Sequence, residues 1–174
     1  MGAIDGKVII VTGSSRGIGK AIAKVCGSEG ANIVIVGRTE QEGGRLPGTI
    51  HETVEEIKAA GGQAIAVRCD VTDEEQVQAL AQSVLDTHGR IDAVVNNAGV
   101  QVNVGLLDLQ TRHWDLTMRV NLRGVFLCCK YLIPPMIEQK SGSIINITSG
   151  AGETARANGI SYSVTKAGLN IMTR

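Results

Sequence analysis

Short runs of β-branched apolar residues alternate along this chain with longer helical patterns, and this alternation constrains the fold more than any other feature. The apolar runs lie at residues 7–11, 32–36, 64–69, 91–95 and 143–148. Such alternation is typical of βαβ units, in which helices cover both faces of a parallel sheet. The sequence therefore predicts an α/β protein with a Rossmann-type, doubly wound parallel sheet.

Helical periodicity fills the intervals between the apolar runs. Residues 18–28 carry Ile18, Ile22 and Val25 at the i, i+4, i+7 spacing of one helix face. A longer pattern begins at about Thr111, and we expect the proline pair at 134–135 to kink or end that helix. The pattern that follows the last apolar run predicts a final helix over about 161–174.

Two segments match the capping box, in which a Ser or Thr and a Glu three residues later close the start of a helix. Thr49 and Glu52 form one such pair, and Thr72 and Glu75 form the other. The first helix is expected to stop at Gly61, and the second before Gly89.

Composition limits the possible classes of protein. At about 150 residues per domain, the 174 residues predict a single domain, 1–174. The 17 basic and 17 acidic residues give zero formal charge, so no basic surplus favours nucleic acid or a membrane surface. No run approaches the roughly 18 apolar residues of a membrane span. We expect a cytoplasmic protein.

The four cysteines, Cys26, Cys69, Cys128 and Cys129, include no Cys-x-x-Cys pair and no zinc-like spacing with histidine. We interpret them as reduced, mostly buried thiols. No metal site is predicted.

The doubly wound dinucleotide fold usually has six strands in the order 3-2-1-4-5-6, whereas five are predicted here. The final helical pattern also reaches Arg174 without a closing Gly, Asn or Pro. We therefore expect the outer C-terminal strand or strands to be missing, and the chain to be the N-terminal part of a longer protein.

A glycine-rich motif, Thr12-Gly-Ser-Ser-Arg-Gly-Ile-Gly19, joins the first predicted strand to the first helix. Glycines at 13, 17 and 19 allow a tight turn and a close approach of the backbone to a pyrophosphate at the helix N-terminus. Taken alone the motif is also compatible with a turn that binds nothing. The strand before it and the helix after it favour dinucleotide binding.

The residues at the end of the second predicted strand indicate which dinucleotide, NAD or NADP, the site would bind. An acidic residue there binds the adenosine ribose of NAD, whereas an arginine accommodates the 2′-phosphate of NADP. The strand ends at Gly37-Arg38, and the nearest acids, Glu40 and Glu42, lie further along the loop. Arg38, assisted by Arg16, therefore predicts NADP (NADPH), although a solvated loop arginine is the ordinary alternative.

Two further motifs follow in order: Asn96-Asn-Ala-Gly99 after the fourth predicted strand, and Tyr162-Ser-Val-Thr-Lys166 in the last helix. Together with the glycine motif they resemble the short-chain dehydrogenase/reductase family, classical type, over nearly the whole chain. The resemblance implies a nicotinamide-dependent oxidoreductase. The loop at 39–48 is similar to loops in hydroxysteroid dehydrogenase-like members.

The chemistry of the last motif supports this resemblance. Tyr162 and Lys166 are four residues apart and share one face of a helix, and an ammonium near a phenol favours the phenolate. Tyr162 is therefore the candidate general acid/base, and Lys166 is also a candidate ligand of the nicotinamide ribose.

The resemblance implies two more catalytic residues. Ser149 occupies the place of the catalytic serine, and Thr148 and Ser143 are competing hydroxyls on the same predicted strand. Asn121 matches the fourth catalytic position and is assigned to a water-mediated proton path to Lys166. Without the resemblance, we would interpret Asn121 as an amide with a structural role.

The cofactor-binding residues expected from the glycine motif, from the Arg38 turn and from the family are drawn from five segments. They are Gly13, Ser14, Ser15, Arg16, Gly17, Ile18, Gly19, Arg38, Asp70, Val71, Asn97, Ala98, Gly99, Tyr162 and Lys166.

The sequence thus supports two hypotheses of function. The first is hydride transfer between NADP(H) and a carbonyl or secondary alcohol, by a protein whose complete chain forms a homodimer or homotetramer. The second is a truncated, inactive chain that binds a nucleotide or a partner. The intact set of motifs favours the first, and the abrupt end favours the second.

Overall fold

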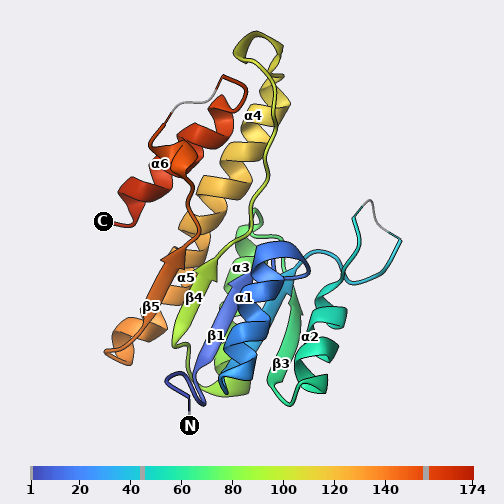
Figure 1. Ribbon diagram of the computed structural model, residues 1–174. Coiled ribbons are helices and arrows are strands. Elements are labelled where there is room, and N and C mark those ends of the chain that lie inside the picture. The colour runs from blue at the N-terminus through green and yellow to red at the C-terminus, as the bar shows by residue number, and fades with distance from the viewer. Residues whose placement is uncertain (1, 44–45, 155–156) are drawn as a thin grey trace.

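The computed structural model describes residues 2–43, 46–154 and 157–174. Five parallel strands form one sheet in the order β3-β2-β1-β4-β5. They are β1 (Val8–Thr12), β2 (Asn32–Gly37), β3 (Gln63–Arg68), β4 (Ala93–Asn96) and β5 (Ser143–Asn146). All five strands run in one direction and their carboxyl ends meet at one edge (Figure 1). The predicted Rossmann-type sheet is confirmed.

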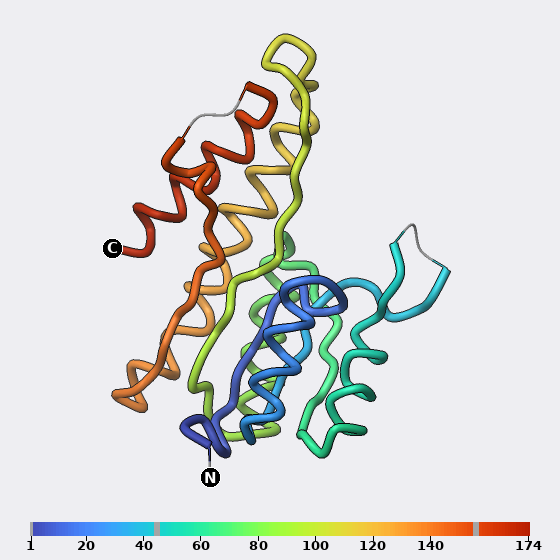
Figure 2. Tube along the Cα trace, viewed as in Figure 1, coloured from blue at the N-terminus to red at the C-terminus, as the bar shows by residue number. Residues whose placement is uncertain are grey.

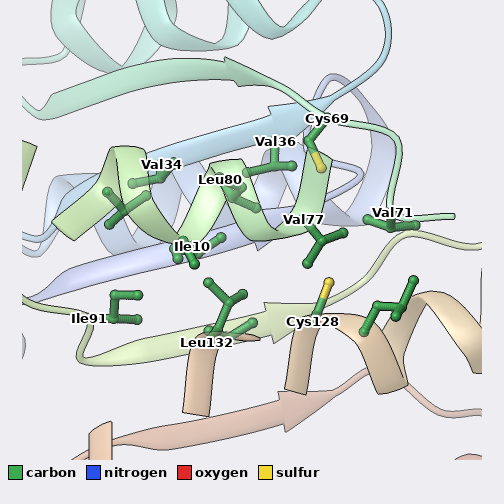
Figure 3. Packing of buried hydrophobic residues seen from close by; sticks show 14 of the residues in the cluster. Ile10, Val34, Val36, Cys69, Val71, Val77, Leu80, Ile91, Cys128 and Leu132 are labelled. Atoms are coloured by element: carbon green, nitrogen blue, oxygen red, sulfur yellow. The ribbon is translucent and has the colours of Figure 1, made fainter. Parts of the chain in front are cut away.

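Two helices cover each face of the sheet. On one face lie α1 (Gly17–Ser28) and α2 (Ile50–Ala59), packed on Ile9 and Val11 of β1. On the other lie α3 (Glu74–His88) and α5 (Gly124–Glu138), packed on Val8 and Ile10. Figure 3 shows Leu80 of α3 and Leu132 of α5 meeting at Ile10. Successive β1 residues thus face opposite layers, as the pleat of a strand requires.

The helix before α5 extends beyond the carboxyl ends of the strands (Figure 1). It consists of α4 (Thr111–Met118) and a π-helical turn, η2 (Arg119–Arg123), which leads directly into α5. The last helix, α6 (Ile160–Met172), lies beside α4 and η2, above the carboxyl ends of the strands (Figure 2). Two short 3-10 turns, η1 (Leu106–Asp108) and η3 (Gly150–Gly152), complete this region.

Two of the three apolar residues predicted to share one face of α1 lie outside the face that this helix buries, whereas Ile22 is partly buried against the core. Ile18 is 66% exposed and Val25 is 63% exposed, whereas Gly19, Ala23 and Gly27 are buried. Small residues let α1 lie close to its neighbours, since a Cβ on Gly27 would stand 2.8 Å from Ile57. The periodicity located the helix, and close packing determined its buried face.

One of the two predicted capping boxes is confirmed and the other is wrong. Thr49 and Glu52 close the start of α2 with reciprocal hydrogen bonds. The start of α3 is capped by Asp73, whose carboxylate accepts from the backbone N–H of Gln76 at 3.1 Å. The Thr72 hydroxyl instead donates to Asp70 at 2.9 Å, so it does not cap the helix.

The prolines do not end the long helix, because α5 continues through Pro134 and Pro135 to Glu138. Leu132 and Met136 on either side of the pair are buried against the sheet, and this packing offsets the lost backbone donors. By length and mean hydropathy the helix 111–138 is long and apolar enough to cross a membrane. A helix packed in a protein core passes the same test, so this observation carries little weight.

The fifth strand ends at Asn146, two residues earlier than predicted. Ser149 therefore stands beyond the strand, as the residue that precedes and caps η3. The four cysteines are free thiols, and Cys69 and Cys128 are buried.

Candidate active site

The glycine-rich turn between β1 and α1 packs directly on the segment that follows β4. Gly13 and Gly17 have positive φ angles of 63° and 58°, a conformation that favours glycine. A Cβ on Gly13 would lie 2.8 Å from the Cα of Ala98, and one on Gly19 would lie 2.6 Å from the carbonyl oxygen of Gly13. The turn is therefore as tight as the motif predicts.

Hydrogen bonds of Thr12 and Asn97 fix these two segments together. The Thr12 hydroxyl accepts from the backbone N–H groups of Asn97 and Ala98, both at 3.0 Å. The Asn97 amide donates to the carbonyl oxygens of Thr12 at 2.9 Å and Gly13 at 3.1 Å. This role of Thr12 was not predicted from the sequence, although its position at the start of the glycine motif was a usable signal.

A cavity of about 540 Å³ opens at the carboxyl ends of the strands, and we name it the larger cavity. Ten of the predicted cofactor-binding residues line it: Gly13, Ser15, Arg16, Ile18, Arg38, Asp70, Val71, Asn97, Ala98 and Gly99. Residues from four separate connections of the sheet thus meet around one hollow, at the edge where α/β sheets bind ligands.

Three predicted cofactor-binding residues of the turn do not line the larger cavity: Ser14, Gly17 and Gly19. Ser14 is fully buried, and its hydroxyl donates to the carbonyl of Val11 at 2.6 Å and accepts from the N–H of Val36 at 3.0 Å. Its side chain joins β1 to β2. Gly17 and Gly19 shape the backbone of the turn and the start of α1.

The Arg38 side chain is 62% exposed and lies 3.4 Å from the Asp70 carboxylate. Burial acts to raise the pKa of Asp70, but hydrogen bonds from Thr72 and the charge of Arg38 outweigh it, and the pKa is lowered. The fold therefore places Asp70 beside Arg38, although no acidic residue stands next to Arg38 in the sequence of the turn. The two groups form a charged pair on the cavity wall.

Tyr162 and Lys166 lie one helical turn apart on α6, as predicted. The Lys166 ammonium is 5.4 Å from the centre of the Tyr162 ring and donates to the carbonyl of Ile147 at 2.6 Å. Burial lowers the pKa of Lys166. The Ile147 carbonyl, which the sequence could not mark as important, fixes the position of this ammonium.

Ser149 and Tyr162 line a second hollow of about 280 Å³, which we name the smaller cavity. The Ser149 hydroxyl accepts from the N–H of Ala151 at 3.2 Å, so its hydrogen can be donated elsewhere. Three amide side chains of this wall were not predicted from the sequence. They are Gln101, Asn103 and Asn158.

Asn121 is completely buried in the π-helical turn. Its side chain makes two 2.8 Å hydrogen bonds with the backbone of Val100, one as donor and one as acceptor. Its amide also donates to the Thr165 hydroxyl at 3.3 Å, which links it to the helix that carries Tyr162 and Lys166. Asn121 thus joins three segments around the candidate catalytic residues.

Neither competing hydroxyl, Thr148 or Ser143, lines the smaller cavity. Thr148 and Ser143 are both exposed, and Ser143 begins the opposite end of β5. Within the described residues, no group of three or more His, Cys, Asp or Glu side chains is arranged to hold a metal ion.

Residues 7–174 match the sequence model of the family described as short chain dehydrogenase. The chain belongs to the short-chain dehydrogenase/reductase family. It is 44% identical over 147 residues to hydroxysteroid dehydrogenase-like protein 2 of Bos taurus, a match that covers 84% of this chain and 35% of that protein. It is 40% identical over 169 residues to a 3-oxoacyl-[acyl-carrier-protein] reductase of Synechocystis sp., covering 97% of this chain and 66% of that one.

Solved structures of short-chain dehydrogenases share the fold. A metagenomic short-chain oxidoreductase in complex with NADP superposes with a TM-score of 0.89 and 40% identity, covering 97% of this chain and 74% of that chain. The chain spans only about a third of the length of the hydroxysteroid dehydrogenase-like proteins that it matches.

Proposed function

We propose that this chain carries the cofactor-binding and catalytic residues of an oxidoreductase that transfers a hydride between NADP(H) and a carbonyl compound or secondary alcohol. The observation that carries the proposal is the convergence of ten predicted residues on the larger cavity. Membership of a dehydrogenase family and the NADP complex of a solved relative support it.

The residues of the glycine-rich turn fit a pyrophosphate. No side chain caps the N-terminus of α1, and no acidic residue occupies its first turn. The backbone N–H groups there are therefore available to an anion, and the helix dipole favours negative charge. Gly13 and Gly17 keep the backbone close to the cavity, and Arg38 supplies a cation for a 2′-phosphate.

When bound, the nicotinamide ring would accept or donate the hydride. Tyr162 would give a proton to the substrate oxygen during reduction, or remove one during oxidation. The Lys166 ammonium, held by the Ile147 carbonyl, stabilises the negative charge of the phenolate. Ser149 would donate its hydroxyl hydrogen to the same substrate oxygen within the smaller cavity.

Asn121 would act as a positioning residue in this scheme. It fixes Val100 and Thr165, and therefore the approach of α6 to the larger cavity. The proton path from Lys166 to Asn121 through water stays a prediction, since the Lys166 ammonium bonds to Ile147 and reaches Asn121 through no direct contact among the described atoms.

Equilibrium titration and turnover assays test the proposal together. The chain should bind NADPH at one site, more tightly than NADH, and reduce at least one member of a panel of aldehydes and ketones. Failure to bind either cofactor would contradict the proposal. Binding without turnover would favour the alternative function, nucleotide binding without catalysis.

A further inference from the structure

The wall of the smaller cavity carries more polar side chains than a reaction at one substrate oxygen uses. Ser149 and Tyr162 are assigned to that oxygen. Gln101, Asn103 and Ser163 line the same cavity and have no part in the proposed transfer. All three are neutral, and each can both donate and accept a hydrogen bond. We name these three residues the second polar group.

The hydroxyl of Ser163 is buried and meets no hydrogen-bond partner in the described part of the chain. Ser163 follows Tyr162 in the first turns of α6 and lines the smaller cavity. A buried hydroxyl without a partner costs free energy, and native proteins seldom keep one without a water, an ion or a ligand to bond it. Because Ser163 lines the cavity, a molecule bound there can supply the missing partner.

Another serine of the same helix shows what is particular to Ser163. Ser161 is also buried, and its hydroxyl also lacks a partner among the described residues. However, Ser161 is not one of the described residues that line the smaller cavity. Of these two unpartnered hydroxyls, a ligand in the cavity can therefore reach only that of Ser163.

Gln101 and Asn103 lie in the connection that follows β4, and they bond each other at the cavity. The Gln101 side-chain amide donates to the Asn103 side-chain oxygen at 2.6 Å. This bond leaves Gln101 its own side-chain oxygen and leaves Asn103 both of its amide hydrogens. The pair therefore offers an acceptor and donors together, which suits a hydroxyl group because a hydroxyl needs both.

The charge and the size of the smaller cavity limit what it can hold. Among the described residues that line it, none has a charged side chain. A carboxylate would therefore lose its water without gaining a counter-charge. The volume of about 280 Å³ lies just below the roughly 300–1,000 Å³ of pockets for drug-sized ligands, so a small substrate fits better than a large one.

We propose that the substrate is a small ketone with a second, neutral oxygen, a hydroxyl that the second polar group binds while the carbonyl oxygen lies at Ser149 and Tyr162. The inference rests on the proposed function. In the reduction, the hydride of NADPH goes to the carbonyl carbon and the Tyr162 proton goes to its oxygen, so the products are a diol and NADP⁺. The second hydroxyl leaves unchanged.

The test is equilibrium titration of ketones into the chain, followed by NMR of its backbone and side-chain amides. The ketones share a methyl-ketone end and a spacer of one to three methylenes, and they terminate in a hydroxyl, a methyl or a carboxylate. NADP⁺ is present because it has no hydride to give, so the ketones stay unreacted. The hydroxyl series should bind about tenfold more tightly than the methyl series, the effect of one or two neutral hydrogen bonds, and should shift the side-chain amide signals of Gln101 and Asn103.

Ser163→Ala and Ser161→Ala form a matched pair of variants. Ser163→Ala should reduce the preference for the hydroxyl series to about threefold or less, whereas Ser161→Ala should leave it unchanged. Neither should lower the melting temperature, since each removes a buried hydroxyl that has no described partner. Gln101→Leu should also reduce the preference, and Gln110→Leu, which replaces an exposed amide outside both cavities, should not.

Three results would overturn the inference: no binding of any ketone, equal or tighter binding of the methyl or carboxylate series, or equal effects of the two serine variants. The same spectra report on the proposed function independently. If NADP⁺ shifts no signal of the glycine-rich turn, the proposed function fails, whatever the ketones do.

Discussion

The half of the molecule that carries the proposed cofactor site and the half that carries the proposed catalytic residues rest on strands of very different burial. All five residues of β1, beneath the glycine-rich turn, are buried, whereas β5, which leads to Ser149, alternates between exposed and half-buried residues. Thr12 and Asn97 of the first half have their polar atoms bonded across segments. In the second half, the buried hydroxyl of Ser163 meets no partner in the described part of the chain.

This difference indicates that the two halves are organised to different degrees. The larger cavity is shaped by a backbone that packing and hydrogen bonds fix before any ligand binds. The smaller cavity is lined by polar side chains of separate loops, and the Ser149 hydroxyl there accepts from the N–H of Ala151 and keeps its own hydrogen free to be donated.

The largest expected effect concerns the second half. Tyr162→Phe keeps the ring but removes the exchangeable proton, so turnover of a carbonyl substrate should fall by about 10²–10⁴-fold. The affinity for NADPH should change little. Steady-state kinetics and titration measure the two quantities separately.

The other tyrosine provides a matched control. Tyr131 lies on α5 and donates to Glu74 at 2.9 Å, away from both cavities. Tyr131→Phe should leave turnover unchanged. Near-normal turnover in Tyr162→Phe would remove Tyr162 from the role of acid/base.

The two strands should also differ in their contribution to stability. Ile10 on β1 is fully buried between α3 and α5, so Ile10→Ala should lower the free energy of unfolding by about 2–5 kcal/mol. Ile145 on β5 is 41% exposed, and Ile145→Ala should cost less than about 1 kcal/mol. Urea denaturation compares them, and equal costs would contradict the difference between the halves.

The preference for NADPH over NADH tests the role proposed for Arg38 in the half that contains the larger cavity. Arg38→Asp places a carboxylate where a 2′-phosphate is expected, so NADPH affinity should fall by about 10–100-fold while NADH affinity stays the same or rises. Arg68→Asp is the control, because Arg68 is exposed, pairs with Glu40 and lies outside the larger cavity. If Arg38→Asp left the preference for NADPH unaltered, another group would have to bind the 2′-phosphate.

The smallest expected effect is a dependence of stability on pH. Burial acts to raise the pKa of Asp92, but Arg90, the N–H of Val8 and Lys7 outweigh it, and the pKa is lowered. Its contribution is therefore complete above the unfolded pKa of about 3.9 and is lost as pH falls through the folded pKa.

Asp92→Asn should remove this dependence. The variant should be less stable than the native chain at pH 7, and the difference between them, on the order of 1 kcal/mol, should shrink below about pH 4. Urea denaturation across pH 2–7 measures it. A difference that stays constant with pH would show that Asp92 stabilises the fold without its charge.

Much of the fold was predictable because its signals are local. The apolar runs, the Thr49–Glu52 capping box and the glycine-rich turn each depend on neighbouring residues, and the strand order is the one expected of the doubly wound fold. The buried face of α1 was not predictable from hydrophobicity, since close packing selected Gly19, Ala23 and Gly27 over Ile18 and Val25. Asp73 displaced Thr72 as a cap because Asp70 already bonds the Thr72 hydroxyl.

The candidate site also has a part that local sequence predicts and a part that it does not. The segments around Gly13, Arg38, Asp70 and Asn97 were predicted from the sequence, and the fold brings them to the larger cavity because each follows a predicted strand. The contacts that fix those residues come from distant segments. The Asp70 carboxylate at Arg38, the Ile147 carbonyl at Lys166 and the Gly48 carbonyl at Arg16 are separated from their partners by 19 or more residues. No local pattern marks a backbone carbonyl for such a role.

Amide hydrogen exchange with and without NADPH tests the central claim most directly, since one measurement reports protection at every segment of the proposed cofactor site. We expect the cofactor to slow exchange at the glycine-rich turn and at the segments after β2, β3 and β4, with β5 unchanged. Exchange that slows mainly at β5 and the outer side of α5, or that does not change at all, would contradict the claim that the larger cavity is a preformed site for NADP(H).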